Sequence, residues 1–202
     1  MTGPAAPPRV ANDEARIRVL RGAYDCVARY GFAKTTMADV ARAAGSSRAT
    51  VYRLFPGGRD ELFSAMVAWE MDRFFVDMAG AVAGAEDFAA VVEGALVFAH
   101  RGIREHAALQ KVLATEPDRL LGFMTREQER ILTAVVAYLR PMLEAEAGAG
   151  RVRPDVDLGA ATRYVATMAL SLMSTPGRFD LEDPLVVQGL VRQELLGGIL
   201  VG

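Results

Sequence analysis

The side chains with the clearest chemical use lie together in one short segment of this 202-residue chain. They are hydrogen-bond donors and small groups along one predicted helix: Ser47, Arg48, Ala49, Thr50, Tyr52 and Arg53. Arginine and hydroxyl side chains bind base edges and phosphates, and a helix fits the major groove of DNA. The segment therefore predicts non-covalent recognition of DNA rather than catalysis.

Two short helices joined by a tight turn are predicted to position this surface. Thr36 is placed to cap the first helix, and Asp39 completes a capping box three residues later. Gly45 supplies the left-handed residue of the turn, and Ser47 caps the second helix. The expected buried positions are Met37, Val40, Ala41 and Ala44 in the first helix, and Val51 and Phe55 in the second. A helix pair with surface arginines also occurs in other helical proteins, so this outline alone leaves a purely structural role open.

The segment from about Ile17 to Phe63, roughly a quarter of the chain, resembles the N-terminal domain of TetR/AcrR transcriptional regulators. The order of short motifs carries the resemblance: aromatic-Gly-Phe, paired threonines, an alanine-rich helix, Ala-Gly, Ser-Arg, Val-Tyr and Phe-Pro. The resemblance implies phosphate contacts from Thr36, Ser47, Tyr52 and Arg59. It places Arg48, Ala49 and Thr50 nearest the base edges. Arg53 completes the predicted DNA-binding set.

The chain departs from the family pattern in two places. Ser46 stands where the family often has an apolar residue, which predicts a slightly looser turn. The entry to the following helix reads Phe-Pro-Gly-Gly-Arg-Asp-Glu over residues 55–61, one residue longer than the family's Phe-Pro-Ser-Lys-Glu. The added glycine leaves two possibilities for Arg59, which are a phosphate contact or a displaced side chain.

Charge is distributed unevenly along the chain. Residues 1–60 contain ten Lys or Arg and five Asp or Glu, a formal charge of +5, whereas residues 61–202 contain thirteen and twenty, a charge of −7. A basic module on an acidic body is expected when one end of a protein meets phosphates. Short segments also vary by a few charges by chance, so the asymmetry is supporting evidence only.

Composition excludes several other classes of protein. No apolar run approaches the roughly 18 residues needed to cross a membrane, and the N-terminus lacks a signal-peptide pattern, so we expect no membrane partner. One cysteine, Cys26, fits a reducing cytoplasm. The two histidines, His100 and His106, are too far apart to share a helical face, and no catalytic motif occurs. We therefore predict no enzyme activity, no cofactor and no metal site.

Helical periodicity runs through almost the whole chain, and no stretch alternates with the period of a strand. The fold class is predicted to be all-α, with about nine helices. A flexible arm is expected over residues 1–11, a three-helix DNA-binding head over 12–57, and a body that binds a ligand and dimerises over 58–202. Within the body, Thr125 with Gln128 predicts a capping box that starts a helix reaching about Ala147, and the last helix is expected over residues 184–201.

The body is rich in methionine and aromatic residues, which line pockets for apolar molecules well. The predicted ligand pocket consists of Met66, Trp69, Phe98, Phe123, Met124, Tyr138, Met142 and Met168. Plain hydrophobic core is the alternative for each of them. The ligand itself, a small-molecule effector, is not identified by these residues.

The last two predicted helices carry broad apolar bands that favour a homodimer. The predicted interface consists of Tyr164, Leu172, Leu190, Leu195 and Ile199. Two such helices from each subunit would form a four-helix bundle, as the family resemblance implies. The alternative is that both bands pack only within the chain.

Together these features predict a sequence-specific regulator that binds a palindromic operator in double-stranded DNA as a homodimer. The resemblance implies a repressor that a small apolar or amphipathic ligand releases from DNA. Two alternatives keep the head only as structure, namely a helical small-molecule carrier and a protein-interaction module.

Overall fold

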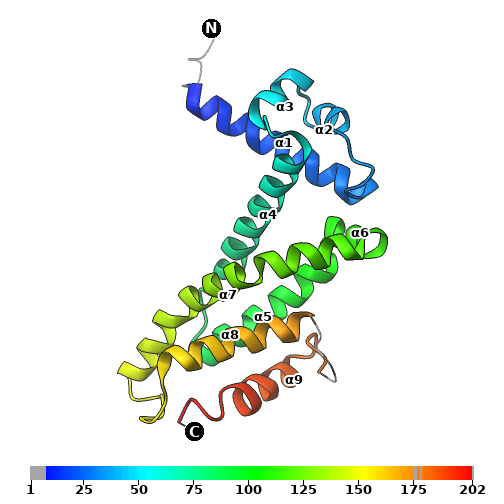
Figure 1. Cartoon of the computed structure of the whole chain (residues 1–202). Coiled ribbons are helices and arrows are strands. Elements are labelled where there is room, and N and C mark those ends of the chain that lie inside the picture. The colour runs from blue at the N-terminus through cyan, green and yellow to red at the C-terminus, as the bar shows by residue number, and fades with distance from the viewer. Residues whose placement is uncertain (1–7, 175–176, 178, 202) are drawn as a thin grey trace. The chain divides into compact units, whose positions relative to one another are not determined.

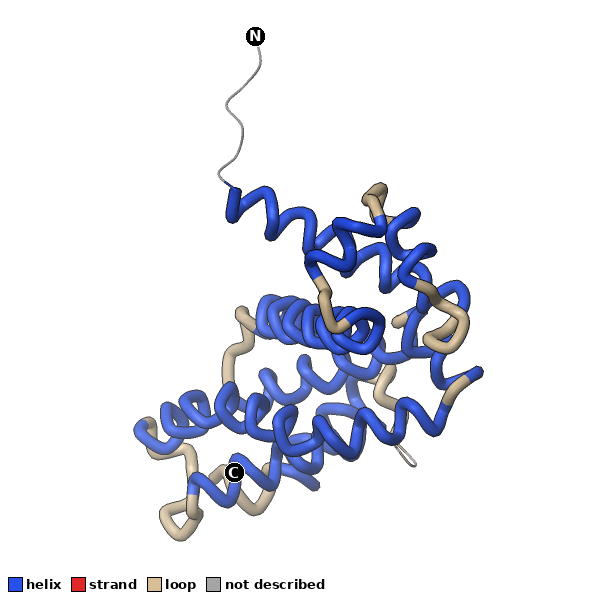
Figure 2. The backbone as a smooth tube through the Cα atoms, turned by 45° about the horizontal axis from the view of Figure 1, so that its top comes forward, coloured by secondary structure: helices blue, strands red, loops and turns tan. Residues whose placement is uncertain are grey.

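The computed structural model describes residues 8–174, 177 and 179–201, and the side chains of residues 8–11, 123, 124, 126 and 174 lie outside that description. Within this part of the chain the regular structure is helical, and the single β-bridge, between Val152 and Leu200, belongs to no strand (Figures 1 and 2). None of its helices is long and apolar enough to cross a membrane. The predicted all-α fold class is confirmed.

The described residues form nine α-helices and one π-helix. Their bounds are α1 Pro8–Tyr30, α2 Met37–Ala43, α3 Arg48–Leu54, α4 Gly58–Val82, α5 Phe88–Glu105, α6 Ala107–Thr115, α7 Pro117–Gly148, α8 Leu158–Ser174, α9 Pro184–Gly189 and the π-helix η1 Leu190–Leu195 (Figure 1). The expected helix over residues 184–201 thus changes to π geometry after Gly189 and ends at Leu195.

Two helices begin earlier than the sequence predicts. α1 starts at Pro8 rather than near Asn12, because proline is well suited to the first turn of a helix. α7 starts at Pro117, so Thr125 lies inside a helix instead of capping one. Its hydroxyl donates to the Leu121 carbonyl one turn back, which is the bond that a mid-helix threonine makes.

The chain divides into two compact units. The head unit contains residues 8–75 and 106–120 of the described chain, and the body unit contains 76–105 and 121–201. α6 therefore belongs to the head unit, although the sequence suggested a boundary at residues 57–58. The reason is packing, because Ala108 and Val112 of α6 are buried in the same core as Val19 and Leu20 of α1.

The core of the head unit holds the two short helices against α1. Val40 of α2 and Val51 of α3 are completely buried, and Phe55 fills the centre of the unit just after α3. Gly22 of α1 allows the closest approach, since an added Cβ there would lie 2.9 Å from the Ala44 backbone nitrogen. This core fixes the direction in which α3 presents its outer face.

The core of the body unit is built around α5, which packs against α8 and against α9 with η1 (Figure 1). Asp87 holds the start of α5 in place. One of its carboxylate oxygens accepts a hydrogen bond from the Ala90 amide at 2.7 Å, and the two oxygens accept from Arg192 of η1 at 3.1 and 3.2 Å. Asp87 thus caps α5 and connects it to the last helical segment.

The pKa of Asp87 is lowered, first by the Ala90 amide and then by the Arg192 guanidinium. A lowered pKa adds stability above the ordinary range of a carboxyl group and loses it as the pH falls through the folded value. We expect Asp87→Asn to lower the free energy of unfolding at pH 7 by roughly 0.5–1 kcal/mol, a small value because the side chain is over one-third exposed. Urea denaturation at pH 7 and pH 3.5 measures this.

The difference in the free energy of unfolding between wild type and Asp87→Asn should be smaller at pH 3.5 than at pH 7. Asp77→Asn, which removes the same charge at an exposed site on α4, serves as the control. An equal difference at both pH values would contradict the role of the Asp87 charge.

Candidate nucleic-acid interface and ligand hollow

The helix α2 begins and ends with the motifs that its sequence predicts. Thr36 Oγ1 accepts from the Asp39 amide at 3.2 Å, and Asp39 Oδ2 accepts from the Thr36 amide at 3.2 Å, so the capping box is confirmed. The Thr36 hydroxyl also donates to Asp39 Oδ2 at 2.5 Å, and this bond first, followed by the bond from the Thr36 amide, lowers the pKa of Asp39. After the helix, Gly45 has φ of +58°, and the Ser46 amide donates to the Ala41 carbonyl at 2.8 Å. This Schellman-type ending reverses the chain sharply before α3.

The helix α3 is fixed at both ends. Ser47 Oγ accepts from the Thr50 amide at 3.1 Å, which confirms the predicted cap. At the other end Arg16 Nη1 donates to the Leu54 carbonyl at 3.3 Å, and its guanidinium lies 4.5 Å from the centre of the Phe55 ring. Arg16 was missed by sequence reasoning, because it lies 38 residues away and has no local motif.

The outer face of α3 carries the predicted DNA-binding set. Thr50 is half-buried and the others are exposed: Ser47, Arg48, Ala49, Tyr52 and Arg53. Tyr52 is 51% exposed although it is a large aromatic residue on a small head. Such a face, held by a buried core and two capped helices, is rigid and rich in donors, which suits a groove of duplex DNA.

A hollow of about 410 Å³ lies where α2 and α3 approach the start of α4. Its lining is Thr35, Thr36, Met37, Ala38, Arg48, Tyr52 and Arg59. Four predicted DNA-binding residues, Thr36, Arg48, Tyr52 and Arg59, are thus brought together across three helices. The others, Ser47, Ala49, Thr50 and Arg53, lie on or before α3 but outside this lining. Arg53 is also 3.4 Å from Asn12 Oδ1 of α1.

Arg59 is the predicted contact whose side chain is most engaged within the head unit. The added glycine, Gly58, takes φ of +71° at the start of α4. Arg59 Nη2 then donates to the Phe32 carbonyl, and the guanidinium lies 5.2 Å from the centre of the Phe63 ring. Its Nε is buried and has no hydrogen-bond partner among the described residues. Arg59 thus connects α4 to the α1–α2 loop, and only part of its guanidinium remains to face the hollow.

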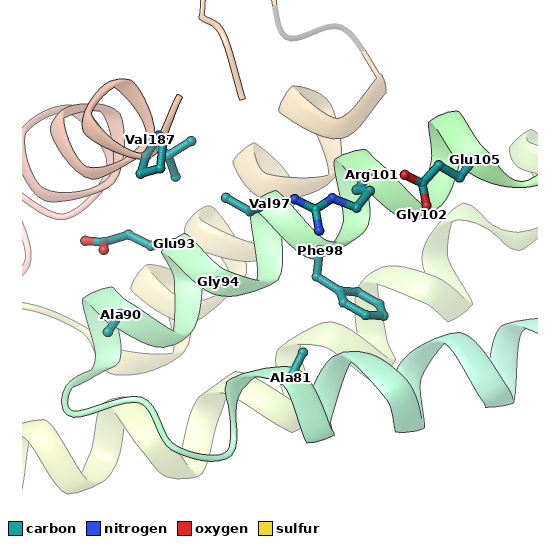
Figure 3. A pocket seen from close by; sticks show the side chains of 11 residues that line it. Ala81, Ala90, Glu93, Gly94, Val97, Phe98, Arg101, Gly102, Glu105 and Val187 are labelled. Carbon is teal, nitrogen blue, oxygen red and sulfur yellow. The ribbon is translucent and has the colours of Figure 1, made fainter. Parts of the chain in front are cut away.

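A second hollow, of about 600 Å³, lies in the body unit along one side of α5 (Figure 3). Its lining comes from α4, α5 and α9: Ala81, Ala90, Glu93, Gly94, Val97, Phe98, Arg101, Gly102, Glu105, Pro184 and Val187. Phe98 points towards Ala81, and Arg101 and Glu105 extend back along α5 towards Val97 (Figure 3). Glu93 is bound by Arg192 Nε at 2.8 Å. The hollow therefore has a largely apolar wall and a charged end at Arg101 and Glu105.

The structure separates the predicted ligand-pocket residues. Phe98 lines the body hollow. Met66 lies in the head core, and Trp69 packs partly against that core with the Arg73 guanidinium 4.8 Å from its ring. Tyr138, Met142 and Met168 are half-buried against the body core, and the side chains of Phe123 and Met124 lie outside the described residues. Sequence reasoning missed the wall formed by Ala90, Gly94 and Gly102, because small residues carry no pocket signal.

The predicted dimer interface needs correction. Leu172, Leu190, Leu195 and Ile199 are buried in the chain's own body core, so these side chains are not available to a partner. Tyr164 of α8 is 45% exposed and remains available. The apolar stripe of an amphipathic helix looks the same whether it packs within the chain or against another subunit, which explains the error. Leu185 of α9, 77% exposed, was not in the predicted set.

Comparisons of sequence support the resemblance seen in the head. Residues 19–66 match the model of the tetR family of bacterial regulatory proteins. The chain is 29% identical over 189 residues to an HTH-type transcriptional regulator of Mycobacterium tuberculosis, covering 92% of this chain and 94% of that protein. It is 28% identical over 154 residues to an HTH-type transcriptional repressor of the same species, covering 74% and 76%.

Solved structures show that the similarity extends over both units. A structure described as the molecular basis for control of antibiotic production by bacterial hormones aligns with a TM-score of 0.64 and 19% identity, covering 93% of this chain and 98% of that one. The complex of SmeT with triclosan aligns with a TM-score of 0.61 and 20% identity, covering 93% and 92%. At these identities the structures share the fold.

Proposed function

Since this chain belongs to the TetR family of bacterial transcriptional regulators, we propose that it binds a palindromic operator as a homodimer and represses nearby genes until a small effector binds its body unit. The observation that carries this proposal is the outer face of α3. Two capped helices and a buried core hold its arginine, hydroxyl and tyrosine groups outward. A helix presented in this way enters the major groove in helix-turn-helix proteins.

Within the proposed operator complex, the predicted DNA-binding side chains fall into two groups according to their position on and around α3. Arg48, Ala49 and Thr50 begin α3, so we assign them to base edges. Thr36, Ser47, Tyr52 and Arg53 surround these positions and are assigned to the phosphate backbone. Arg59 adds positive charge near the hollow of the head unit. Because its Nη2 donates to the Phe32 carbonyl, only part of the guanidinium is available for contact with a phosphate.

Dimerisation supplies the second half-site. One α3 has only seven residues, and helix-turn-helix domains reach useful affinity by placing two recognition helices on successive major grooves. Tyr164 of α8 and Leu185 of α9 are the large exposed apolar side chains of the last two helices, so we assign them to the subunit interface. In such a dimer, each subunit would place its α3 in one half of the palindromic operator.

The effector is assigned to the body hollow. A volume of about 600 Å³ suits a drug-sized molecule, and its mixed lining fits an apolar or amphipathic one. SmeT, which shares the fold, is bound to triclosan in its solved structure. An effector that favours one of two arrangements of the heads would change operator affinity by a coupling of about 1–3 kcal/mol.

The direct experiment is binding of the purified protein to DNA that flanks its own coding region. We expect salt-dependent retardation, protection of a palindromic site, and sedimentation as a dimer. A small-molecule carrier or a protein-interaction module would leave this DNA unbound, and a monomer would favour the interaction module. Failure to bind any flanking fragment at low ionic strength would refute the proposal.

The hollow is tested by filling it from its exposed side. Ala81 is exposed on α4 and lines the hollow, so Ala81→Trp should occupy the space near Phe98 without disturbing the core. We expect the affinity for a fluorescent amphipathic probe, 1-anilinonaphthalene-8-sulfonate, to fall by at least about tenfold in a fluorescence titration. Ala83→Trp, two residues later and outside the lining, is the control and should bind the probe normally. Equal probe binding by both variants would place the site elsewhere.

A further inference from the structure

The short helix α6 is attached to the head unit at both ends. At its C-terminal end, Glu116 Oε1 accepts from the Ala33 amide at 2.9 Å. Ala33 lies in the loop between α1 and α2, just before the capped start of α2. Gly31 leaves room for this contact, since an added Cβ would lie 2.7 Å from the same Glu116 oxygen. The C-terminal end of α6 therefore holds in place the loop that leads into α2 and α3.

The N-terminal end of α6 is held by His106. Its Nδ1 accepts from the Leu109 amide at 3.1 Å, which makes the imidazole the cap of the helix. Its Nε2 lies 3.3 Å from Glu70 Oε2 of α4, and its ring meets the Tyr24 ring of α1 edge-on, with centroids 5.2 Å apart. One side chain thus joins α6 to both α1 and α4.

The cap determines where the imidazole carries its proton. A backbone N–H can donate only to a ring nitrogen without a proton, so Nδ1 is unprotonated. The proton of the neutral ring is then on Nε2, where it faces the Glu70 carboxylate. Both hydrogen bonds hold together only in this neutral tautomer.

We propose that His106 is a proton-sensitive positioning residue for operator binding, which holds α6 in place when neutral and releases its cap when protonated. The proposal rests on the proposed operator binding. A proton on Nδ1 would face the Leu109 N–H, so that two donors oppose each other. It would also place a positive charge at the positive end of the α6 dipole.

The charged groups around the imidazole do not compensate for the lost hydrogen bond between Nδ1 and the Leu109 amide. The groups facing the ring are Tyr24 from α1, and Glu70 with its partner Arg73 from α4, while Glu105 precedes it in the chain. Glu70 would attract a charged imidazole, but it already pairs with Arg73 at 3.1 Å, and both partners of the His106 contact are partly exposed. Burial first, and then Glu70, raises the pKa of Tyr24, so Tyr24 stays neutral throughout the range from pH 7.5 to pH 5.5. Acid therefore weakens the attachment of α6.

The test compares wild type with His106→Asn in the full-length protein at fixed ionic strength. Asparagine caps helices well but does not titrate, so it keeps the cap and removes the switch. Between pH 7.5 and 5.5 we expect the hydrogen-exchange protection of the Leu109 amide, corrected for intrinsic exchange, to fall by about three- to tenfold in wild type, the size of a lost cap. His106→Asn should keep its protection.

Operator affinity is measured over the same range by fluorescence anisotropy. Because asparagine keeps a cap but loses the ring contacts with Glu70 and Tyr24, the two dissociation constants need not agree at pH 7.5. The ratio of the wild-type to the His106→Asn dissociation constant should rise by about three- to tenfold between pH 7.5 and pH 5.5. Constant Leu109 protection in wild type would overturn the proposal whatever the variant does. If the Leu109 protection of wild type falls with pH but the operator affinities of wild type and His106→Asn change with pH in the same way, the positioning role would be overturned. Absence of operator binding by both proteins would instead refute the proposed function, and the exchange data distinguish the two failures.

Discussion

Arg48→Ala is expected to weaken binding of the operator by about 1–3 kcal/mol, or roughly 5- to 150-fold, which is the value of a bidentate arginine–guanine contact. Arg48 is the first residue of α3 and is exposed, and it lines the hollow shared with Thr36 and Tyr52. Because a dimer carries the substitution twice, the upper part of this range is expected for the palindromic site. Fluorescence anisotropy with the flanking operator fragment measures the change.

Two comparisons separate a base contact from a general loss of charge. Arg130→Ala removes an exposed arginine from α7 and should leave operator affinity within about twofold, because its charge is far along the chain from α3 and is screened by salt. Against non-specific DNA, Arg48→Ala should lose much less affinity than against the operator. An equal loss on both DNAs would show that Arg48 contacts a phosphate, and no loss on either would remove it from the interface.

Phe55→Ala is expected to lower the free energy of unfolding of the head unit by about 3–5 kcal/mol, the usual cost of removing a buried aromatic ring. Phe55 is fully buried, follows α3 directly, and carries the Arg16 guanidinium on its ring. Its removal leaves a cavity and frees the arginine that bonds the end of α3. Urea denaturation followed by the fluorescence of Trp69, the single tryptophan of the chain, reports on this unit.

Phe55→Leu is the matched control, since it keeps most of the volume and should cost less than about 1.5 kcal/mol. Near-native stability of Phe55→Ala would contradict the central place of this ring in the head core. Operator binding should be lost in Phe55→Ala in proportion to the unfolded fraction. A well-folded variant that fails to bind DNA would show that Phe55 acts through the orientation of α3 instead.

The helix-turn-helix was predictable because its signals are local. The capping box of Thr36 and Asp39, the left-handed Gly45 and the Ser47 cap each involve residues within a few positions, and all three features are present. The buried positions follow from helical period alone, and Val51 and Phe55 are fully buried as expected. The DNA contacts of the outer face remain proposals, because no local rule states which group a surface side chain will meet.

The features that depend on distant residues could not be predicted in the same way. The burial of Leu172 and Leu190 in the body core, and the burial of Met66 in the head core, depend on which helix each apolar stripe faces. Helical periodicity shows that one face of a helix is apolar, but it does not show which element that face packs against. Assignment of α6 to the head unit has the same origin, since Ala108 packs against a helix some eighty positions earlier in the chain.

The amino-acid order by itself determined the helical class, the capped helix pair and the donor-rich face of α3, because hydrogen bonds between near neighbours produce them. Only the tertiary structure decided that Arg59 bonds the Phe32 carbonyl, that small residues of α5 form a hollow, and that His106 joins three helices. These arrangements depend on side chains that meet after the helices have packed, and neither periodicity nor spacing along the chain encodes such meetings.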